Sequence, residues 1–195
     1  MSAELSDDQL DRYARHIILK EIGGSGQAKL LASSVAVVGA GGLGSPCLMY
    51  LAAAGVGRLT VIDDDNVALS NLQRQILHGP ADVGRAKTDS ARDGLARINP
   101  DAVVTPQRVR LDPVNAAALL AGHDVVADGS DSFATRLTVA DTCLALRIPL
   151  VSAAVGPFDG QLATFRGWDA GLPCYRCYVG SDPGRDDTSC ADQGV

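Results

Sequence analysis

The sequence predicts an α/β protein with a doubly wound, mostly parallel sheet of the Rossmann-like type. An apolar run at 35–38 leads into a glycine-rich loop, and a helix-length segment of small residues follows at 45–54. A second apolar run, 58–63, ends in Asp63. This order of strand, glycine loop, helix, strand and acid is the layout of a nucleotide-binding βαβ unit. Strand and helix patterns then alternate along the chain, which is typical of a doubly wound sheet.

The glycine loop has the spacing Gly39-x-Gly41-x-x-Gly44, and each glycine has a separate physical task. Gly39 permits a tight turn, Gly41 lets the backbone approach phosphates, and Gly44 lets helix and strand pack closely. The helix that follows presents unpaired N–H groups to an anion. Asp63, 24 positions after Gly39, is placed to accept hydrogen bonds from ribose hydroxyls. The alternative is a glycine turn that serves packing alone, and the strand context and the acid argue against it.

The N-terminal segment is expected to be helical. Ser6 and Gln9 have the spacing of a capping box, and apolar residues at helical spacing predict one helix over 7–19. Three glycines are expected to end that helix: Gly23, Gly24 and Gly26. A short helix at 27–31 is expected to lead into the first strand.

The remaining elements follow from periodicity and from residues that end helices. Helices are expected at 85–98, 114–121 and 134–147. Further strands are expected at 102–109, 124–128 and 149–153, with an antiparallel extension at 160–166. The pair Asn99-Pro100 ends the helix at 85–98, because a residue before proline disfavours the helical region.

Length and composition indicate one domain over 1–195. We expect an N-terminal helical segment (1–33), a Rossmann-like core (34–166) and a cysteine-containing tail (167–195). The net charge of −6 excludes wholesale nucleic-acid binding. No apolar run reaches membrane-spanning length, and the acidic N-terminus lacks the features of a secretory signal. We therefore expect a cytoplasmic protein with no membrane partner.

A polar, cationic insert follows Asp63, which a plain NAD-binding domain does not need. Arg74 and Lys87 suit triphosphate oxygens, the former as a planar fork and the latter as a point charge. Asn71 and Gln73 are suited to fix orientation by hydrogen bonds. The alternative is that both cations belong to a surface salt-bridge network with two neighbouring acids, Asp64 and Asp65.

A second acidic position follows the fourth expected strand. Asp131 comes just past the carboxyl end of that strand, where open α/β sheets bind ligands. Its carboxylate is suited to hold Mg²⁺ on phosphates, because hard cations prefer oxygen ligands. Asp128, closer to the strand, is expected to be a strand-end residue rather than a ligand.

These motifs together resemble the MoeB/ThiF family, which is related to the adenylation half of ubiquitin-activating enzymes. The resemblance extends in order over essentially the whole chain. The segments that carry it are Arg12-Tyr13-x-Arg15, Gly39–Gly44, Ala54–Gly57, Ser70-Asn-Leu-Gln-Arg74, Val83-Gly84-x-x-Lys87, Arg97–Pro100, Cys174-x-x-Cys177 and Thr188-Ser-Cys190.

The resemblance implies ATP-dependent adenylation of a small ubiquitin-like sulfur-carrier protein that ends in Gly-Gly. The carrier is MoaD-like, for molybdopterin synthesis, or ThiS-like, for thiamine synthesis. Pyrophosphate leaves as the acyl-adenylate forms on the C-terminal glycine. No general base is required, because a C-terminal carboxylate is already ionised at neutral pH.

The resemblance also implies a role for each site residue. Arg74 and Lys87 neutralise phosphates, Asp131 serves the magnesium ion, and Asp63 holds the ribose. The nucleotide site is further lined by Gly42, Ser70, Asn71, Gln73 and Ser132, the last standing where the family commonly has Asn. Arg15 matches an arginine that reaches the ATP site of the other subunit, which implies a homodimer. The alternative is that Arg15 is an ordinary solvated residue.

The five cysteines divide into three groups. Cys47 and Cys143 lie in apolar helical patterns and are expected to be small buried hydrophobes. Cys174 and Cys177 are half of a tetrahedral zinc site, whose second pair in the family lies beyond residue 195. We therefore expect the chain to be a truncated form, with Zn²⁺ possible in a longer protein. Cys190 matches a cysteine that bonds the carrier covalently in some relatives, and a third zinc ligand or a loop thiol without catalytic duty is the alternative.

Three other functions stay open at this point. The first is an NAD-dependent dehydrogenase, which the cationic insert and the lack of a group for hydride chemistry disfavour. The second is a non-catalytic module that binds nucleotide or carrier. The third is adenylation of a different acceptor, either another carrier protein or a small-molecule carboxylate.

Overall fold

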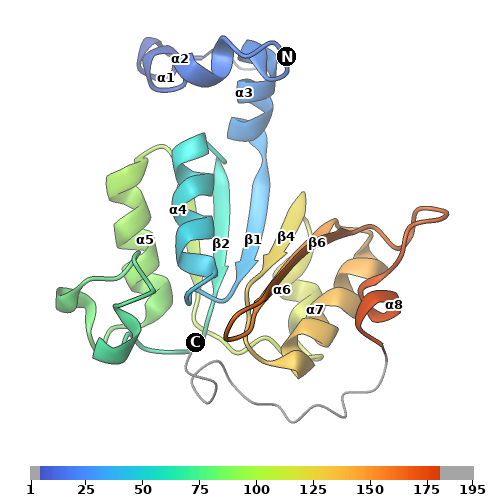
Figure 1. The fold of residues 1–195 in the computed structure, drawn as a ribbon. Coiled ribbons are helices and arrows are strands. Elements are labelled where there is room, and N and C mark those ends of the chain that lie inside the picture. Colours follow the sequence, from blue (N-terminus) through green and yellow to red (C-terminus); the bar gives the residue numbers. More distant parts are fainter. Residues whose placement is uncertain (1–4, 181–195) are drawn as a thin grey trace.

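A computed structural model describes residues 5–180, so the interpretations of Cys190 lie outside the described residues. Six strands form one sheet in the order β3-β2-β1-β4-β5-β6 (Figure 1). The strands are β1 (Ser34–Val38), β2 (Arg58–Ile62), β3 (Val103–Gln107), β4 (Val125–Asp128), β5 (Leu150–Val155) and β6 (Gly160–Phe165). The predicted fold class is confirmed.

The central strand β1 is buried along its whole length, because it is covered on both faces. Its Val37 pairs in parallel with Val61 of β2 and with Ala127 of β4. Strands β1 to β5 run parallel, and β6 pairs antiparallel with β5, as the sequence predicted. Pro106 is accommodated in β3 because this is an edge strand, where a missing N–H breaks no ladder on the outer side.

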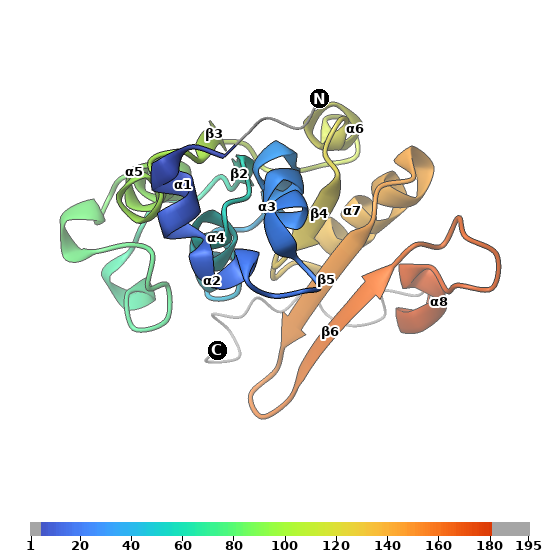
Figure 2. The same cartoon turned by 90° about the horizontal axis from the view of Figure 1, so that it is seen from above.

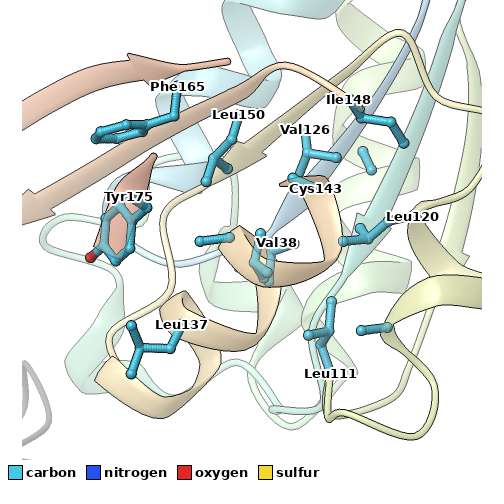
Figure 3. Close-up of a cluster of buried hydrophobic side chains, with 14 of the residues drawn as sticks. Val38, Leu111, Leu120, Val126, Leu137, Cys143, Ile148, Leu150, Phe165 and Tyr175 are labelled. Atoms are coloured by element: carbon cyan, nitrogen blue, oxygen red, sulfur yellow. The ribbon is translucent and has the colours of Figure 1, made fainter. Parts of the chain in front are cut away.

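Helices cover both faces of the sheet, as Figures 1 and 2 show. One face carries α4 (Gly44–Ala54) and α5 (Lys87–Ile98), whose Leu48 and Leu95 join a buried cluster with strand residues. The other face carries α6 (Ala116–Leu120) and α7 (Phe133–Leu146). Figure 3 shows the second buried cluster, in which side chains of both helices meet the sheet. Each layer is held by the apolar face that its helices present.

Cys143 is buried in this second cluster, as expected of a small hydrophobe, whereas Cys47 on α4 is only partly buried. Burial raises the pKa of the Cys143 thiol to about 12, and the nearby charge of Asp128 acts in the same direction. The short helix α8 (Tyr175–Val179) packs against α7 near this cluster. Tyr175 of α8 meets Phe165 of β6 edge to face, with ring centroids 5.3 Å apart.

The N-terminal segment departs from the sequence prediction. It forms α1 (Asp7–Arg12), α2 (Ala14–Ile17) and α3 (Gly23–Ala32). The capping box of Ser6 and Gln9 is confirmed, but the single helix over 7–19 is wrong, because the chain leaves helical geometry at Tyr13. The ring of Tyr13 is buried against Gly55, and this tertiary contact breaks the helix.

The three glycines expected to end the first helix lie inside α3 instead, namely Gly23, Gly24 and Gly26. The helical segment therefore continues nearly to β1 and is longer than the predicted 27–31. Downstream of β2, the polar insert folds into two short 3₁₀ helices, η1 (Leu69–Asn71) and η2 (Pro80–Asp82). Within residues 5–180, no helix has the length and apolar character needed to cross a bilayer.

Candidate functional site

A cleft of about 490 Å³ opens at the carboxyl ends of the parallel strands. Parallel pairing places Val38 beside Asp128, so the loops that follow β1 and β4 leave the sheet next to each other. The insert after β2 and the segment after β3 complete the walls. Of the residues predicted to form a nucleotide site, eight line this cleft: Gly39, Gly41, Gly42, Asp63, Arg74, Lys87, Asp131 and Ser132.

The glycine loop has the geometry that its spacing predicts. Gly39 has a positive φ of 89°, a conformation that favours glycine. A Cβ on Gly44 would lie 1.8 Å from the carbonyl oxygen of Gly39, so helix α4 begins in direct contact with the loop backbone. A Cβ on Gly41 would meet nothing closer than the Gln75 amide at 3.7 Å. The loop is therefore tight where it packs and open where it faces the cleft.

Asp63 closes the loop from the end of β2. Its Oδ2 accepts a hydrogen bond of 2.8 Å from the N–H of Ala40, and its Oδ1 accepts one of 2.8 Å from the N–H of Asp65. Burial raises the pKa of Asp63, and the charge of Lys87 and the two N–H groups oppose that shift. Each carboxylate oxygen retains a lone pair, so the side chain can still accept from a hydroxyl group.

The two predicted phosphate-binding cations both reach the cleft. Lys87 begins α5, and its side chain is only 7% exposed, with Nζ 2.7 Å from Oδ2 of Asp65. Lys87 therefore forms an ion pair with Asp65, as the salt-bridge alternative expected, but its side chain is buried and does not lie on the surface. Arg74 lies over Gly42, where a Cβ would be 3.5 Å from the Arg74 Cδ. Its guanidinium donates a long bond of 3.4 Å to the carbonyl oxygen of Ser70.

The opposite wall is formed by the segment from β4 into α7. Asp131 is exposed in the cleft, and Ser132 is the N-cap of α7, where its hydroxyl accepts a bond of 3.3 Å from the Thr135 N–H. Asp128 is buried, as expected of a strand-end residue, and its Oδ1 accepts from the backbone and hydroxyl of Ser130. Burial raises the pKa of Asp128, which does not line the cleft.

Several predicted site residues lie elsewhere in the described structure. The cleft lining does not include Ser70, Asn71 or Gln73. Asn71 caps its own 3₁₀ turn, with Oδ1 accepting from the Ala68 N–H at 3.1 Å. Arg15 is exposed on α2, and Figure 1 shows this helix at the end of the molecule opposite the carboxyl ends of the parallel strands.

The cleft also contains residues that the sequence did not single out. Arg110 follows the carboxyl end of β3, and Arg136 lies one helical turn into α7, with Nε donating to the Ser130 carbonyl at 2.8 Å. The rule that ligands bind at carboxyl strand ends would have pointed to Arg110. The cleft has an apolar component as well, formed by Val38, Leu43, Ile62, Val109 and Leu111. Cations and apolar surface therefore meet in one cavity.

Cys174 and Cys177 lie together at the start of α8, with their sulfur atoms 2.9 Å apart. The hydrogen bond from the Cys177 thiol lowers the pKa of Cys174. Among residues 5–180, the only group of three potential metal ligands is Asp63, Asp64 and Asp65. The described structure therefore supplies two thiols of a metal site and no third ligand beside them.

The comparisons with known proteins agree with this geometry. Residues 13–195 match the model of the ThiF family. The chain belongs to the ThiF family. It is 48% identical to the SAMP-activating enzyme E1 of Haloferax volcanii, over 100% of this chain and 72% of that protein. It is also 48% identical to the molybdopterin-synthase adenylyltransferase of Escherichia coli, over 99% of this chain and 77% of that protein.

Solved structures of known proteins also resemble this chain in fold. The E. coli tRNA N6-threonylcarbamoyladenosine dehydratase TcdA, solved in complex with ATP, superposes with a TM-score of 0.74 and 30% identity. The match covers 79% of this chain and 63% of the dehydratase chain. The ThiF chain thus spans less than two thirds of that structural relative and about three quarters of the two curated relatives.

Proposed function

We propose that this ThiF protein is an adenylyltransferase that activates the C-terminal glycine of a ubiquitin-like sulfur carrier with ATP. The observation that carries the proposal is the cleft, in which the glycine loop, Asp63, two cations and Asp131 converge. The name of the E. coli relative, a molybdopterin-synthase adenylyltransferase, supports a carrier in molybdopterin synthesis. A carrier in thiamine synthesis stays a prediction.

The residues fit ATP. Gly41 leaves the loop backbone open to phosphates, and Asp63 retains acceptor capacity for a ribose hydroxyl. The apolar wall that includes Ile62 and Leu111 is suited to a base. The ATP complex of the TcdA relative supports nucleotide binding in this fold. Contacts from Ser70, Asn71 and Gln73 stay predictions from the resemblance.

The chemistry is a displacement at the α-phosphate. The carrier's carboxylate is already ionised, so the protein needs to align it with the α-phosphate and to neutralise the departing pyrophosphate. Arg74 and Lys87 are placed for that neutralisation, and such groups act most strongly in a cavity with low dielectric walls. Lys87 is paired with Asp65, which is 66% exposed, so this carboxylate can return to water when a phosphate takes its place beside the buried ammonium group.

Asp131 is the residue that we propose for Mg²⁺. Its carboxylate is exposed in the same cleft as Arg74 and Lys87, and carboxylate oxygens are the ligands that Mg²⁺ prefers. When bound, the ion would screen the phosphate charges. Cys174 and Cys177 are proposed as two thiolate ligands of a zinc site.

We also propose a homodimer in which Arg15 serves the cleft of the other subunit. The support is its position, since Arg15 is exposed on α2 and does not line its own cleft, and Figure 1 shows α2 at the end of the molecule opposite the carboxyl ends of the parallel strands. The division into one domain over 1–195, with the helical segment 1–33 in front of the core, belongs to the same proposal.

The test is ATP–pyrophosphate exchange with Mg²⁺, with and without a carrier that ends in Gly-Gly. We expect exchange that depends on the carrier and falls by about 10²-fold or more in Arg74→Ala and Asp131→Ala. Arg97→Ala is the matched control, because Arg97 is exposed on α5, does not line the cleft, and donates a hydrogen bond of 3.2 Å to the carbonyl oxygen of Asp93. ATP binding without exchange would favour a non-catalytic module, and NAD binding without ATP binding would overturn the proposal.

A further inference from the structure

His78 lies behind the glycine loop and takes no part in the chemistry described above. It is 5% exposed and belongs to the insert between Arg74 and Lys87. Its Nε2 lies 3.1 Å from the carbonyl oxygen of Ala40, and its Nδ1 lies 2.8 Å from the hydroxyl of Ser90 on α5. The ring therefore joins α5 to the glycine loop, whose Ala40 lies 38 residues before His78 in the sequence.

Ala40 is the loop residue between Gly39 and Gly41, and its backbone is bonded on both sides. Its carbonyl oxygen accepts from His78 and from the Ser45 hydroxyl, the latter at 3.1 Å. Its N–H donates to Asp63, as described above. Ala40 itself is fully buried. These bonds fix the middle of a loop whose glycines lose much conformational freedom on ordering.

The hydrogen bonds define the protonation of His78. A carbonyl oxygen only accepts, so Nε2 carries the proton, and the Ser90 hydroxyl can donate to Nδ1 of the neutral ring. Burial lowers the pKa of His78, as does the charge of Lys87, while the Ala40 bond, Asp82 and Asp63 act in the opposite direction. The neutral ring is thus bonded at both nitrogens without a buried charge.

We propose that His78 is a positioning residue that holds the glycine loop in its nucleotide-binding shape through the carbonyl of Ala40. The same insert supplies Arg74 and Lys87 to the cleft, so one segment sets both the cations and the loop. The inference rests on the proposed nucleotide site. It adds a residue that does not line the cleft and acts through the backbone of the loop.

Two substitutions separate the two ends of the ring. A glutamine amide reaches the position of Nε2, so His78→Gln keeps a donor to Ala40, whereas the shorter His78→Asn reaches only the position of Nδ1. We expect the Kd for Mg·ATP, measured by titration of the full chain, to rise about tenfold in His78→Asn. In His78→Gln it should stay within about twofold of the wild type. Both variants remove the same ring and differ from each other by one methylene group, so the main difference between them is whether the amide reaches the Ala40 carbonyl oxygen.

His123→Asn is the matched control. His123 is also bonded at both nitrogens, to the Leu120 carbonyl at 3.0 Å and to the Thr60 hydroxyl at 2.8 Å, but it does not line the cleft. Its substitution should leave the Kd for ATP unchanged. Equal ATP affinity in His78→Asn and His78→Gln would overturn the inference, provided that the wild type binds ATP; a wild type that does not bind ATP would instead contradict the proposed function.

Should His78→Asn fail to fold, Ser90→Ala decides. Ser90 is buried on α5, and alanine is a good helix former, so this variant is expected to fold. It releases the ring at Nδ1 while the ring itself stays. A raised Kd for ATP, measured well below the melting temperature of the variant, supports the inference, and an unchanged Kd overturns it.

Discussion

The side-chain amide of Asn99 donates a hydrogen bond of 2.9 Å to the hydroxyl of Tyr13, which lies 86 residues earlier in the chain. The same amide nitrogen donates to the carbonyl of Ala52 at 2.8 Å. Both side chains are 1% exposed. This pair therefore fastens the N-terminal helices to the ends of α4 and α5, and it gives the Arg-Tyr-x-Arg motif a structural purpose beside any role of Arg15.

Removing the Tyr13 hydroxyl should weaken the fold by a small, measurable amount. In Tyr13→Phe one proton of the Asn99 amide loses its buried partner, which costs about 1–2 kcal/mol in the free energy of unfolding. Urea denaturation measures this. Tyr178→Phe is the control, because Tyr178 is 55% exposed, and it should change stability by less than about 0.5 kcal/mol. An equal effect of the two changes would contradict the assignment.

Substitution by alanine should lower the stability of the fold at one glycine of the loop and leave it nearly unchanged at another. At Gly44 a Cβ would lie 1.8 Å from the Gly39 carbonyl oxygen, and backbone must move to admit it. We expect Gly44→Ala to destabilise the fold by about 3 kcal/mol or more. At Gly42 the nearest atom would be Arg74 Cδ at 3.5 Å, an ordinary contact, so Gly42→Ala should fold normally. Thermal unfolding compares the two, and similar melting temperatures would contradict the loop geometry.

Lys87 should matter more for activity than for stability. Lys87→Met keeps the buried stem and removes the charge, and its partner Asp65 is exposed to water. We expect the exchange rate to fall by about 10²–10³-fold, with a stability change below about 1 kcal/mol. ATP–pyrophosphate exchange assays measure the rate, and urea denaturation of the same preparation measures the free energy of unfolding. Loss of stability with retained exchange would assign Lys87 to the fold alone.

The pair of Asp124 and Ser34 should give a pH-dependent contribution to stability. The N–H of Ser34 donates to Asp124 Oδ2 at 2.8 Å, and this bond, with the Ser34 hydroxyl, lowers the pKa of Asp124. A lowered folded-state pKa stabilises the fold above the unfolded value of about 3.9, and the benefit disappears as the pH falls through the folded value. Asp124→Asn should therefore cost less than about 1 kcal/mol at neutral pH, since Asp124 is exposed. Denaturant titrations between pH 7 and pH 3 should show the difference from wild type shrinking, and a constant difference would contradict this.

Most of the fold could be predicted from the sequence, because the patterns that indicate its core strands and helices are local. The apolar run 35–38, the glycine loop and the acid at the end of β2 are all recognisable within 30 residues of sequence. The break at Tyr13 could not be predicted, because it follows from packing against Gly55 on a different element. Tertiary contact overrides helical periodicity there.

The candidate site was predictable to the extent that residues carry a motif. Asp63, Arg74, Lys87 and Asp131 all lie at the cleft. Arg110 was missed although its place just past a predicted strand was a signal, whereas Arg136 was missed because a lone arginine on a helix has no local signature. The bond from His78 to Ala40 depends in the same way on the return of the insert beneath the loop.

The proposed role of Arg15 in the partner's site leads to a test by mixing two inactive variants. In a homodimer of Arg15→Ala, each site lacks the Arg15 side chain that the other subunit would supply. In a homodimer of Arg74→Ala, each site lacks the Arg74 side chain of its own subunit. A mixed dimer contains one site with its own Arg74 and with Arg15 supplied by the other subunit. Random exchange of subunits makes half of the dimers mixed, so about one quarter of the wild-type exchange activity should return.

The control mixes Arg74→Ala with Lys87→Met. Each change affects the cleft of the subunit that carries it. A mixed dimer of these two variants therefore has no site with both Arg74 and Lys87, and no activity should return. Recovery with Arg15→Ala and none with Lys87→Met establishes that Arg15 acts across the dimer. If Arg15→Ala alone keeps wild-type exchange, Arg15 is an ordinary solvated residue, which agrees with its exposure on α2 as well.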